Sequence, residues 1–198
     1  MADWRDRLNR MSGKTRFAVC RIFVHLAGNE VAPLLGVLNQ VGRDAIEAEG
    51  DLPTLGAGLV QVCQSLLHYD LYWQSAANEG DVFWNEGDAG DYVAELFTDS
   101  AQRYGVEMPA EPSDDDLLSL PVTQNLVVIL TLAYEGEVPA LETDLADIAA
   151  LKAGLKAIMN LDHDSRLRAV QLHFSPAELG DVLTSEQLIL NFPELIPL

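Results

Sequence analysis

One nearly uninterrupted apolar run limits the folds that are open to this chain of 198 residues. Residues Asn125–Ala133 read NLVVILTLA, so apolar side chains occupy almost every position of the run. A run of this kind predicts a strand that is covered on both of its faces. A second run, Phe17–Leu26 (FAVCRIFVHL), is rich in β-branched and aromatic residues. It predicts another strand, although a helix there stays open.

Helices are predicted between the two runs, where apolar residues recur at steps of three and four. The first begins at Glu30, takes Asn29 as its N-cap and tolerates Pro33 in its first turn. Gly50 lies just beyond its end, as is typical of a helix C-terminus. Two further helices are predicted, at residues 55–77 and 90–104.

The C-terminal part of the chain continues with a helix and a strand. Leu141–Ile158 carries leucines and isoleucines at helical steps, and Leu167–Phe174 alternates as a strand does. Strand, helix and strand in this order predict a βαβ unit with parallel strands and a right-handed crossover. A last short helix is predicted to open at Thr184 and to end near Asn191.

These elements predict an α+β fold, in which the helical N-terminal two-thirds of the chain pack on a small sheet. Residues 1–15 are predicted to form a basic N-terminal tail, and residues 16–198 a single domain. Within that domain we expect a helical part at 28–105, an acidic linker at 106–123 and a βαβ-α part at 124–198.

The charge of the chain is strongly acidic and unevenly distributed. The net charge is −19, and the stretch from Asp44 to Leu151 holds 22 Asp and Glu against a single basic residue, Arg103. Nucleic acid is excluded as a partner, because its binding depends on Lys and Arg that neutralise phosphates. The charge fits a protein that binds a partner with a basic face, and a homodimer stays open.

The tetrapeptide Asn-Glu-Gly-Asp occurs twice, at 78–81 and at 85–88, in the middle of the acidic stretch. We interpret both copies as capped turns between two helices, with Asp88 and Asp91 able to cap the second helix. Together with nearby aromatic residues they form a candidate binding surface for a protein. Its members are Trp73, Glu79, Asp81, Trp84, Glu86, Asp88 and Asp91.

A metal site in the same stretch is the alternative interpretation. Ca²⁺ or Mg²⁺ binds carboxylate oxygens, and Asp81, Asp88 and Asp91 could supply them. The chain would then be a metal-dependent or small-molecule enzyme that uses Glu79–Asp91. The spacing does not match an EF-hand, however, and the sequence has no G-x-S-x-G, Walker A, HExxH or CxxC motif. We therefore expect a non-enzymatic protein that has no cofactor.

The remaining reactive side chains are expected to be structural. Cys20 and Cys63 lie in apolar runs and predict buried, reduced thiols. The four histidines are scattered through the chain and none belongs to a ligand motif: His25, His68, His163 and His173.

Membrane insertion is not expected. No run approaches the roughly 18 apolar residues that a spanning helix needs, and the N-terminus is too polar for a signal peptide. We expect a soluble, cytoplasmic protein. Residues 4–16 combine Trp4, Leu8 and Met11 with arginines, which leaves peripheral membrane contact open.

Several stretches resemble a family of proteins of unknown function from cyanobacteria and chloroplasts, which includes plant fluctuating-light acclimation proteins. The similar stretches are residues 66–73 (LLHYDLYW), 126–133 (LVVILTLA), 169–176 (AVQLHFSP), 181–188 (DVLTSEQL) and 192–195 (FPEL). The resemblance implies the family's fold and a role in photosynthetic acclimation, and it implies no catalytic residue. The chain lacks the transmembrane or Gly/Ser-rich segment of many relatives, and Phe174-Ser175 replaces their aromatic-Thr pair.

Overall fold

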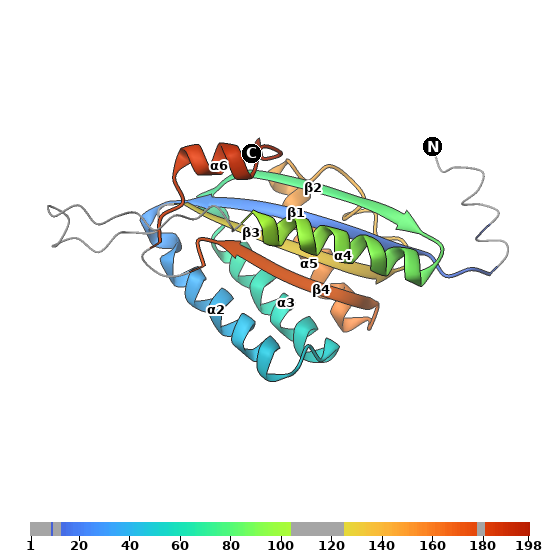
Figure 1. Ribbon diagram of the computed structural model, residues 1–198. Coiled ribbons are helices and arrows are strands. Elements are labelled where there is room, and N and C mark those ends of the chain that lie inside the picture. The colour runs from blue at the N-terminus through green and yellow to red at the C-terminus, as the bar shows by residue number, and fades with distance from the viewer. Residues whose placement is uncertain (1–8, 10–12, 104–124, 178–180) are drawn as a thin grey trace, which may run out of the picture.

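A five-stranded antiparallel sheet organises the chain (Figure 1). The computed structural model describes residues 9, 13–103, 125–177 and 181–198. The order of the strands across the sheet is β4-β3-β1-β2-β5. Their bounds are β1 Phe17–Ala27, β2 Trp73–Phe83, β3 Asn125–Glu135, β4 Leu167–Ser175 and β5 Ile196–Pro197. The predicted α+β class is confirmed.

The two apolar runs form the centre of the sheet, as their composition predicts. Every residue of β1 from Phe17 to Leu26 is buried, and so is every residue of β3 from Leu126 to Tyr134. The two strands lie side by side, and helices cover both faces of the sheet (Figure 1). A strand covered on both faces needs no polar alternation, which explains the continuous apolar runs.

Two helical layers bury the two faces of the sheet. The first layer packs on the face that carries Ile22 and Val24, and the second packs on the face that carries Val19 and Phe23. The first layer consists of α2 Ala32–Glu47, α3 Leu52–His68 and α5 Ile148–His163. The second consists of α4 Glu86–Gln102 and α6 Ser185–Asn191 (Figure 1). Short 3-10 turns lie at Asn29–Val31 and Asp70–Tyr72.

Side chains at the helix ends account for several of these boundaries. Asp51 accepts a hydrogen bond from the amide of Thr54 at 3.2 Å and so caps α3. Thr184 and Gln187 form a capping box at the start of α6, where a helix start is predicted. The predicted cap by Asn29 is wrong, because Asn29 lies in a 3-10 turn and α2 begins at Ala32.

The predicted helix over residues 55–77 is wrong in its second half. The helix α3 ends at His68, and Trp73–Phe83 is strand β2. β2 pairs with the central strand β1 from Phe83 back to Trp73, with one irregularity near its start. The buried β1 needs a hydrogen-bonding neighbour on this side, and that requirement overrides the local sequence of the segment. The predicted helical part at 28–105 therefore contains a strand.

The predicted parallel βαβ unit is also wrong. β3 and β4 are antiparallel neighbours, and Tyr134 near the end of β3 pairs with Leu167 at the start of β4. The helix between them begins at Ile148, so residues 136–147 return along the sheet before α5 starts. Leu141 and Leu145 are buried residues of this returning segment. The predicted linker at 106–123, like most of the predicted tail at 1–15, lies outside the described residues.

Candidate functional site

A row of polar residues crosses the sheet under α4. Arg21 of β1 lies between Glu79 of β2 and Thr131 of β3 in the strand register, and Thr131 pairs with Gln171 of β4. Gln171 donates a hydrogen bond to the carbonyl of Val93 in α4 at 3.3 Å. Along β1 the row separates two apolar clusters on this face of the sheet, one with Phe17 and Val19 and the other with Phe23. It brings a charged side chain into an interior that is otherwise apolar.

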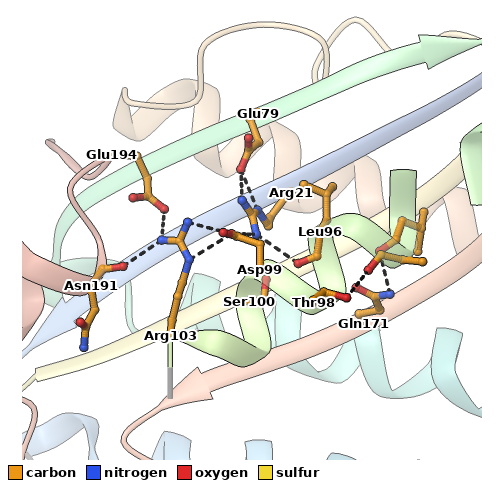
Figure 2. A network of polar contacts seen from close by, with 12 residues as sticks. Arg21, Glu79, Leu96, Thr98, Asp99, Ser100, Arg103, Gln171, Asn191 and Glu194 are labelled. Carbon is orange, nitrogen blue, oxygen red and sulfur yellow. Dashed lines mark hydrogen bonds and ion pairs between the residues drawn. The ribbon is translucent and has the colours of Figure 1, made fainter. Parts of the chain in front are cut away.

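Arg21 is the centre of this row, and its charge is satisfied from two sides (Figure 2). The residue is only 3% exposed, and its Nε donates to Glu79 Oε1 at 2.7 Å. Its Nη1 donates to Asp99 Oδ2 at 2.6 Å and to Ser100 Oγ at 3.0 Å. Burial alone would lower the pKa of Arg21, but the hydrogen bonds that it donates to Glu79 and Asp99 raise it. The guanidinium therefore stays charged and fixes the side chain of Glu79.

Asp99 extends the network to the C-terminal segment. It also accepts hydrogen bonds from Arg103, at 2.9 Å from Nη2 and 3.1 Å from Nε. Arg103 in turn donates to the carbonyl of Asn191 and pairs with Glu194 (Figure 2). Burial would raise the pKa of Asp99, but the hydrogen bonds from the two arginines hold it below its usual value. Five side chains from β1, β2, α4 and the C-terminal segment thus form one ionic network.

A groove of about 670 Å³ lies on the other side of β2, next to the segment that leads from β3 to α5. Residues 78–82 of β2 form one wall, and residues 141–144 form the other. Asn78 holds the two walls together, because its Nδ2 donates to the carbonyl of Thr143 at 2.9 Å and its Oδ1 accepts from the amide of Leu145 at 2.8 Å. The position of the two walls of the groove is therefore fixed by hydrogen bonds of the fold.

Two carboxylates of the returning segment, Glu142 and Asp144, line this groove. Glu79 and Asp81 are also among its lining residues, but their side chains leave β2 on the opposite face, where Glu79 binds Arg21. Glu142 pairs with Arg16 at 2.7 Å, and although burial would raise its pKa, the hydrogen bond from Arg16 lowers it. Asp81 and Asp144 are exposed, and each accepts a hydrogen bond from a nearby backbone amide. None of the ion pairs found among the described residues involves these two aspartates. Negative charge is therefore exposed at Asp144 in the groove and at Asp81 on the other side of the β2 edge.

The outer edge of β2 borders the groove. β5 pairs with this edge only at Ser75 and Ala76, so within the described part of the chain no strand pairs with it from Ala77 to Phe83. On the opposite face of β2 lies a second hollow of about 360 Å³, lined by Glu79 and by residues of the ionic network. The edge is thus flanked by one hollow on each face.

The two tetrapeptides occupy different structures. Residues 78–81 lie within strand β2, so the prediction of a capped turn there is wrong. Asn85 is the N-cap of α4, and its Oδ1 accepts from the amide of Gly87 at 2.8 Å. The second copy therefore caps the helix as predicted, but through Asn85 in place of Asp88 or Asp91.

The structure brings together only part of the predicted site. Glu79 and Asp81 lie on β2 beside the groove with their side chains on its opposite face, and Glu142 and Asp144 line the groove from a distant segment. The other predicted residues lie elsewhere: Glu86, Asp88 and Asp91 in α4, Trp84 between β2 and α4, and Trp73 buried at the far end of β2. No group of three metal-ligating side chains is found in the described ranges, and Asp81 lies in β2 whereas Asp88 and Asp91 lie in α4.

The two cysteines are free and buried as predicted, and the buried His25 has a hydrogen-bond partner at each ring nitrogen. His25 bonds to Ser75 Oγ at 3.0 Å and to Asn125 Oδ1 at 3.1 Å, and burial lowers its pKa. Cys20 and Cys63 are free and buried, and burial raises the pKa of Cys20 to about 12. Thiols of this kind are protonated at neutral pH and therefore poor nucleophiles.

Arg21, which binds the predicted site residue Glu79, was not identified from the sequence. A cation in the middle of a buried strand requires acidic partners, and that signal was present in FAVCRIFVHL. No sequence signal pointed to Glu142 and Asp144, which reach the groove only because residues 136–147 return past β2.

Comparison with known proteins identifies a family. The model of the family described as "Protein of unknown function (DUF1517)" matches residues 16–198, and the chain belongs to this family. No curated protein and no solved structure matches the chain significantly. Across the described ranges, no helix is both long and apolar enough to cross a membrane.

Proposed function

We propose that this member of the DUF1517 family is a non-enzymatic protein-interaction protein that binds a partner with a basic face. The binding site is the groove between β2 and residues 141–144. The observation that carries the proposal is the exposed negative charge on both sides of the β2 edge, at Asp144 in the groove that Asn78 holds together and at Asp81 on the opposite face. Lysine or arginine side chains of the partner would pair with Asp144 in the groove and with Asp81 on the other side of the β2 edge.

The charge of the whole chain supports the same kind of partner. A net charge of −19 repels anionic surfaces and attracts basic ones, and it accelerates association with a basic protein at low ionic strength. Binding should therefore weaken steeply as salt is added, because exposed charges are screened beyond about 10 Å at 0.1 M salt.

A regulatory role in photosynthetic acclimation, in the cytoplasm of the cell, is part of this proposal. It rests on the resemblance of the stretches at residues 66–73 and 126–133, and of the C-terminal stretches, to cyanobacterial and chloroplast proteins. Loss of the protein should then change growth under fluctuating light more than growth under constant light.

Calorimetric titration with a lysine-rich peptide tests the proposed binding site. The double variant Asp81→Asn/Asp144→Asn should bind about tenfold more weakly than the wild type, since it removes two exposed charges that face the ligand. The matched control is Asp88→Asn/Asp91→Asn, which removes the same charge from α4 and should change the affinity by less than about twofold. Equal weakening in both variants would show that only net charge matters and would contradict a site in the groove.

A further inference from the structure

We propose that the partner binds by β-strand addition. An extended segment with lysine or arginine at alternate positions pairs with the outer edge of β2 between Asn78 and Phe83, and its basic side chains enter the acidic groove. This inference rests on the proposed function and adds the geometry of binding and the sequence pattern of the ligand.

The edge of β2 already accepts one strand within the chain itself. β5 pairs antiparallel with it at Ser75 and Ala76, and the amide of Leu198 donates to the carbonyl of Gln74 at 3.0 Å. Just before β5 the chain turns toward α4, where Glu194 pairs with Arg103 (Figure 2). β5 therefore covers only the start of the edge. An incoming strand would continue the pairing where β5 stops.

The backbone of β2 presents hydrogen-bonding groups at regular intervals along this edge. Along a strand, the N–H and C=O groups of alternate residues point to the same side. Gln74 faces β5, and Ala76 pairs with Ile196. Asn78, Gly80 and Val82 follow Gln74 and Ala76 at steps of two, so their backbone N–H and C=O groups also point away from β1. The amide of Val82 bonds to the side chain of Asp81 at 2.7 Å, which an incoming carbonyl can replace.

The two hollows beside the edge suit the alternating side chains of an added strand. Backbone pairing gives affinity in this binding mode, and pockets for alternate side chains give specificity. Side chains on one face would reach the groove with Glu142 and Asp144, which selects lysine or arginine. Side chains on the other face would reach the hollow that Glu79, Arg103 and Glu194 line, which selects polar residues. The expected ligand pattern is basic-polar-basic.

The charge of the edge argues for a partner protein over a second copy of this chain. If two such edges paired with each other, Glu79 and Asp81 of both copies would be brought together in the added ladder. Like charges opposite each other in a sheet are destabilising. A basic segment of another protein meets no such repulsion.

Hydrogen exchange of the β2 amides tests this geometry. The probe is a ten-residue peptide that alternates lysine with threonine, and a peptide with glutamate in place of lysine is its control. With the lysine peptide at about ten times its Kd, the amides of Asn78, Gly80 and Val82 should exchange roughly tenfold more slowly. The glutamate peptide should leave them unchanged.

Backbone N-methylation of the lysine peptide provides a test that needs no change in the protein. Methyl groups on the alternate amides that face β2 should weaken binding by about tenfold, because two or three hydrogen bonds are lost. Methylation of the other amides should have little effect. The variant Val82→Pro, which removes an outward N–H from an edge position, should weaken binding in the same direction.

These experiments distinguish failure of strand addition from failure of the groove as a binding site. If the lysine peptide binds but neither methylation pattern matters and the β2 amides stay unprotected, strand addition is overturned and the acidic groove remains a binding site. If the lysine peptide does not bind at all, the proposed function itself is overturned.

Discussion

The two copies of Asn-Glu-Gly-Asp have the same sequence and opposite structures. Residues 78–81 lie extended in β2, whereas residues 85–88 form the cap and first turn of α4. Asn78 ties a distant segment to the strand, and Asn85 caps its own helix. The local preferences of the two copies are identical, so the difference must come from their surroundings.

The surroundings of each copy explain why the first is a strand and the second is the start of a helix. The first copy lies beside β1, whose buried backbone needs a hydrogen-bonding neighbour, and Arg21 of β1 binds Glu79. The second copy is followed by Ala89, Val93 and Leu96, which are buried at helical spacing. Tertiary pairing decides the first structure, and the amphipathic pattern that follows decides the second.

Substitution of the glycine in each copy should give the largest difference in stability between the two copies. A Cβ on Gly80 would overlap the carbonyl oxygen of Val19 in the neighbouring strand, so Gly80→Ala should reduce the free energy of unfolding by about 3 kcal/mol. Gly87 has no such backbone neighbour, and Gly87→Ala should be neutral or stabilise by up to about 1 kcal/mol. Chemical denaturation of both variants measures the difference. Equal effects would refute the close approach of β2 to β1.

The two glutamates should give the next largest difference. Glu79→Gln leaves the buried guanidinium of Arg21 with one carboxylate, and we expect a loss of about 2 kcal/mol in unfolding free energy. This is less than for a fully buried pair, since the side chain of Glu79 is 45% exposed. Glu86→Gln at the exposed start of α4 should change stability by less than about 0.5 kcal/mol. A wild-type denaturation midpoint for Glu79→Gln would show that Asp99 alone satisfies Arg21.

The two asparagines should have similar costs but different local consequences. Asn78→Ala removes two hydrogen bonds and should cost about 1.5 kcal/mol. Asn85→Ala removes a helix cap and should cost about 1 kcal/mol. Hydrogen exchange should then quicken around residues 143–145 in the first variant and in the first turn of α4 in the second. The reverse pattern would contradict these contacts.

The two aspartates should differ least in stability and most in binding. Asp88→Asn loses a favourable charge at the start of α4, worth about 0.5 kcal/mol, and Asp81→Asn should cost less than that. Binding of the lysine peptide should show the reverse order, with the larger loss for Asp81→Asn. If Asp88→Asn weakens binding more, the site lies on α4 and not at the edge of β2.

Secondary structure was predicted correctly where the apolar pattern or a capping sequence reflects the burial or the end of an element. The runs at β1 and β3 and the alternation at β4 predicted those strands, and the capping sequence at Thr184 predicted the start of α6. These features are local consequences of covering or capping an element.

The rest of the fold depends on contacts between distant residues. β2 carries small and acidic residues, and only its pairing with β1 makes it a strand. The direction of β4 depends on the path of residues 136–147, which no local pattern specifies. Glu79 and Asp81 were predicted as site residues, but the opposite wall of the groove could not be. That wall comes from a segment about sixty residues away in the chain.

The position of the bound lysine peptide distinguishes strand addition at β2 from binding at α4. Intermolecular nuclear Overhauser effects between the peptide and isotopically labelled protein would locate its backbone. Strand addition predicts contacts with Asn78, Gly80 and Val82, with the peptide extended as the next strand beyond the end of β5. Contacts with Glu86, Asp88 and Asp91 at the start of α4, and none along the edge of β2, would contradict it.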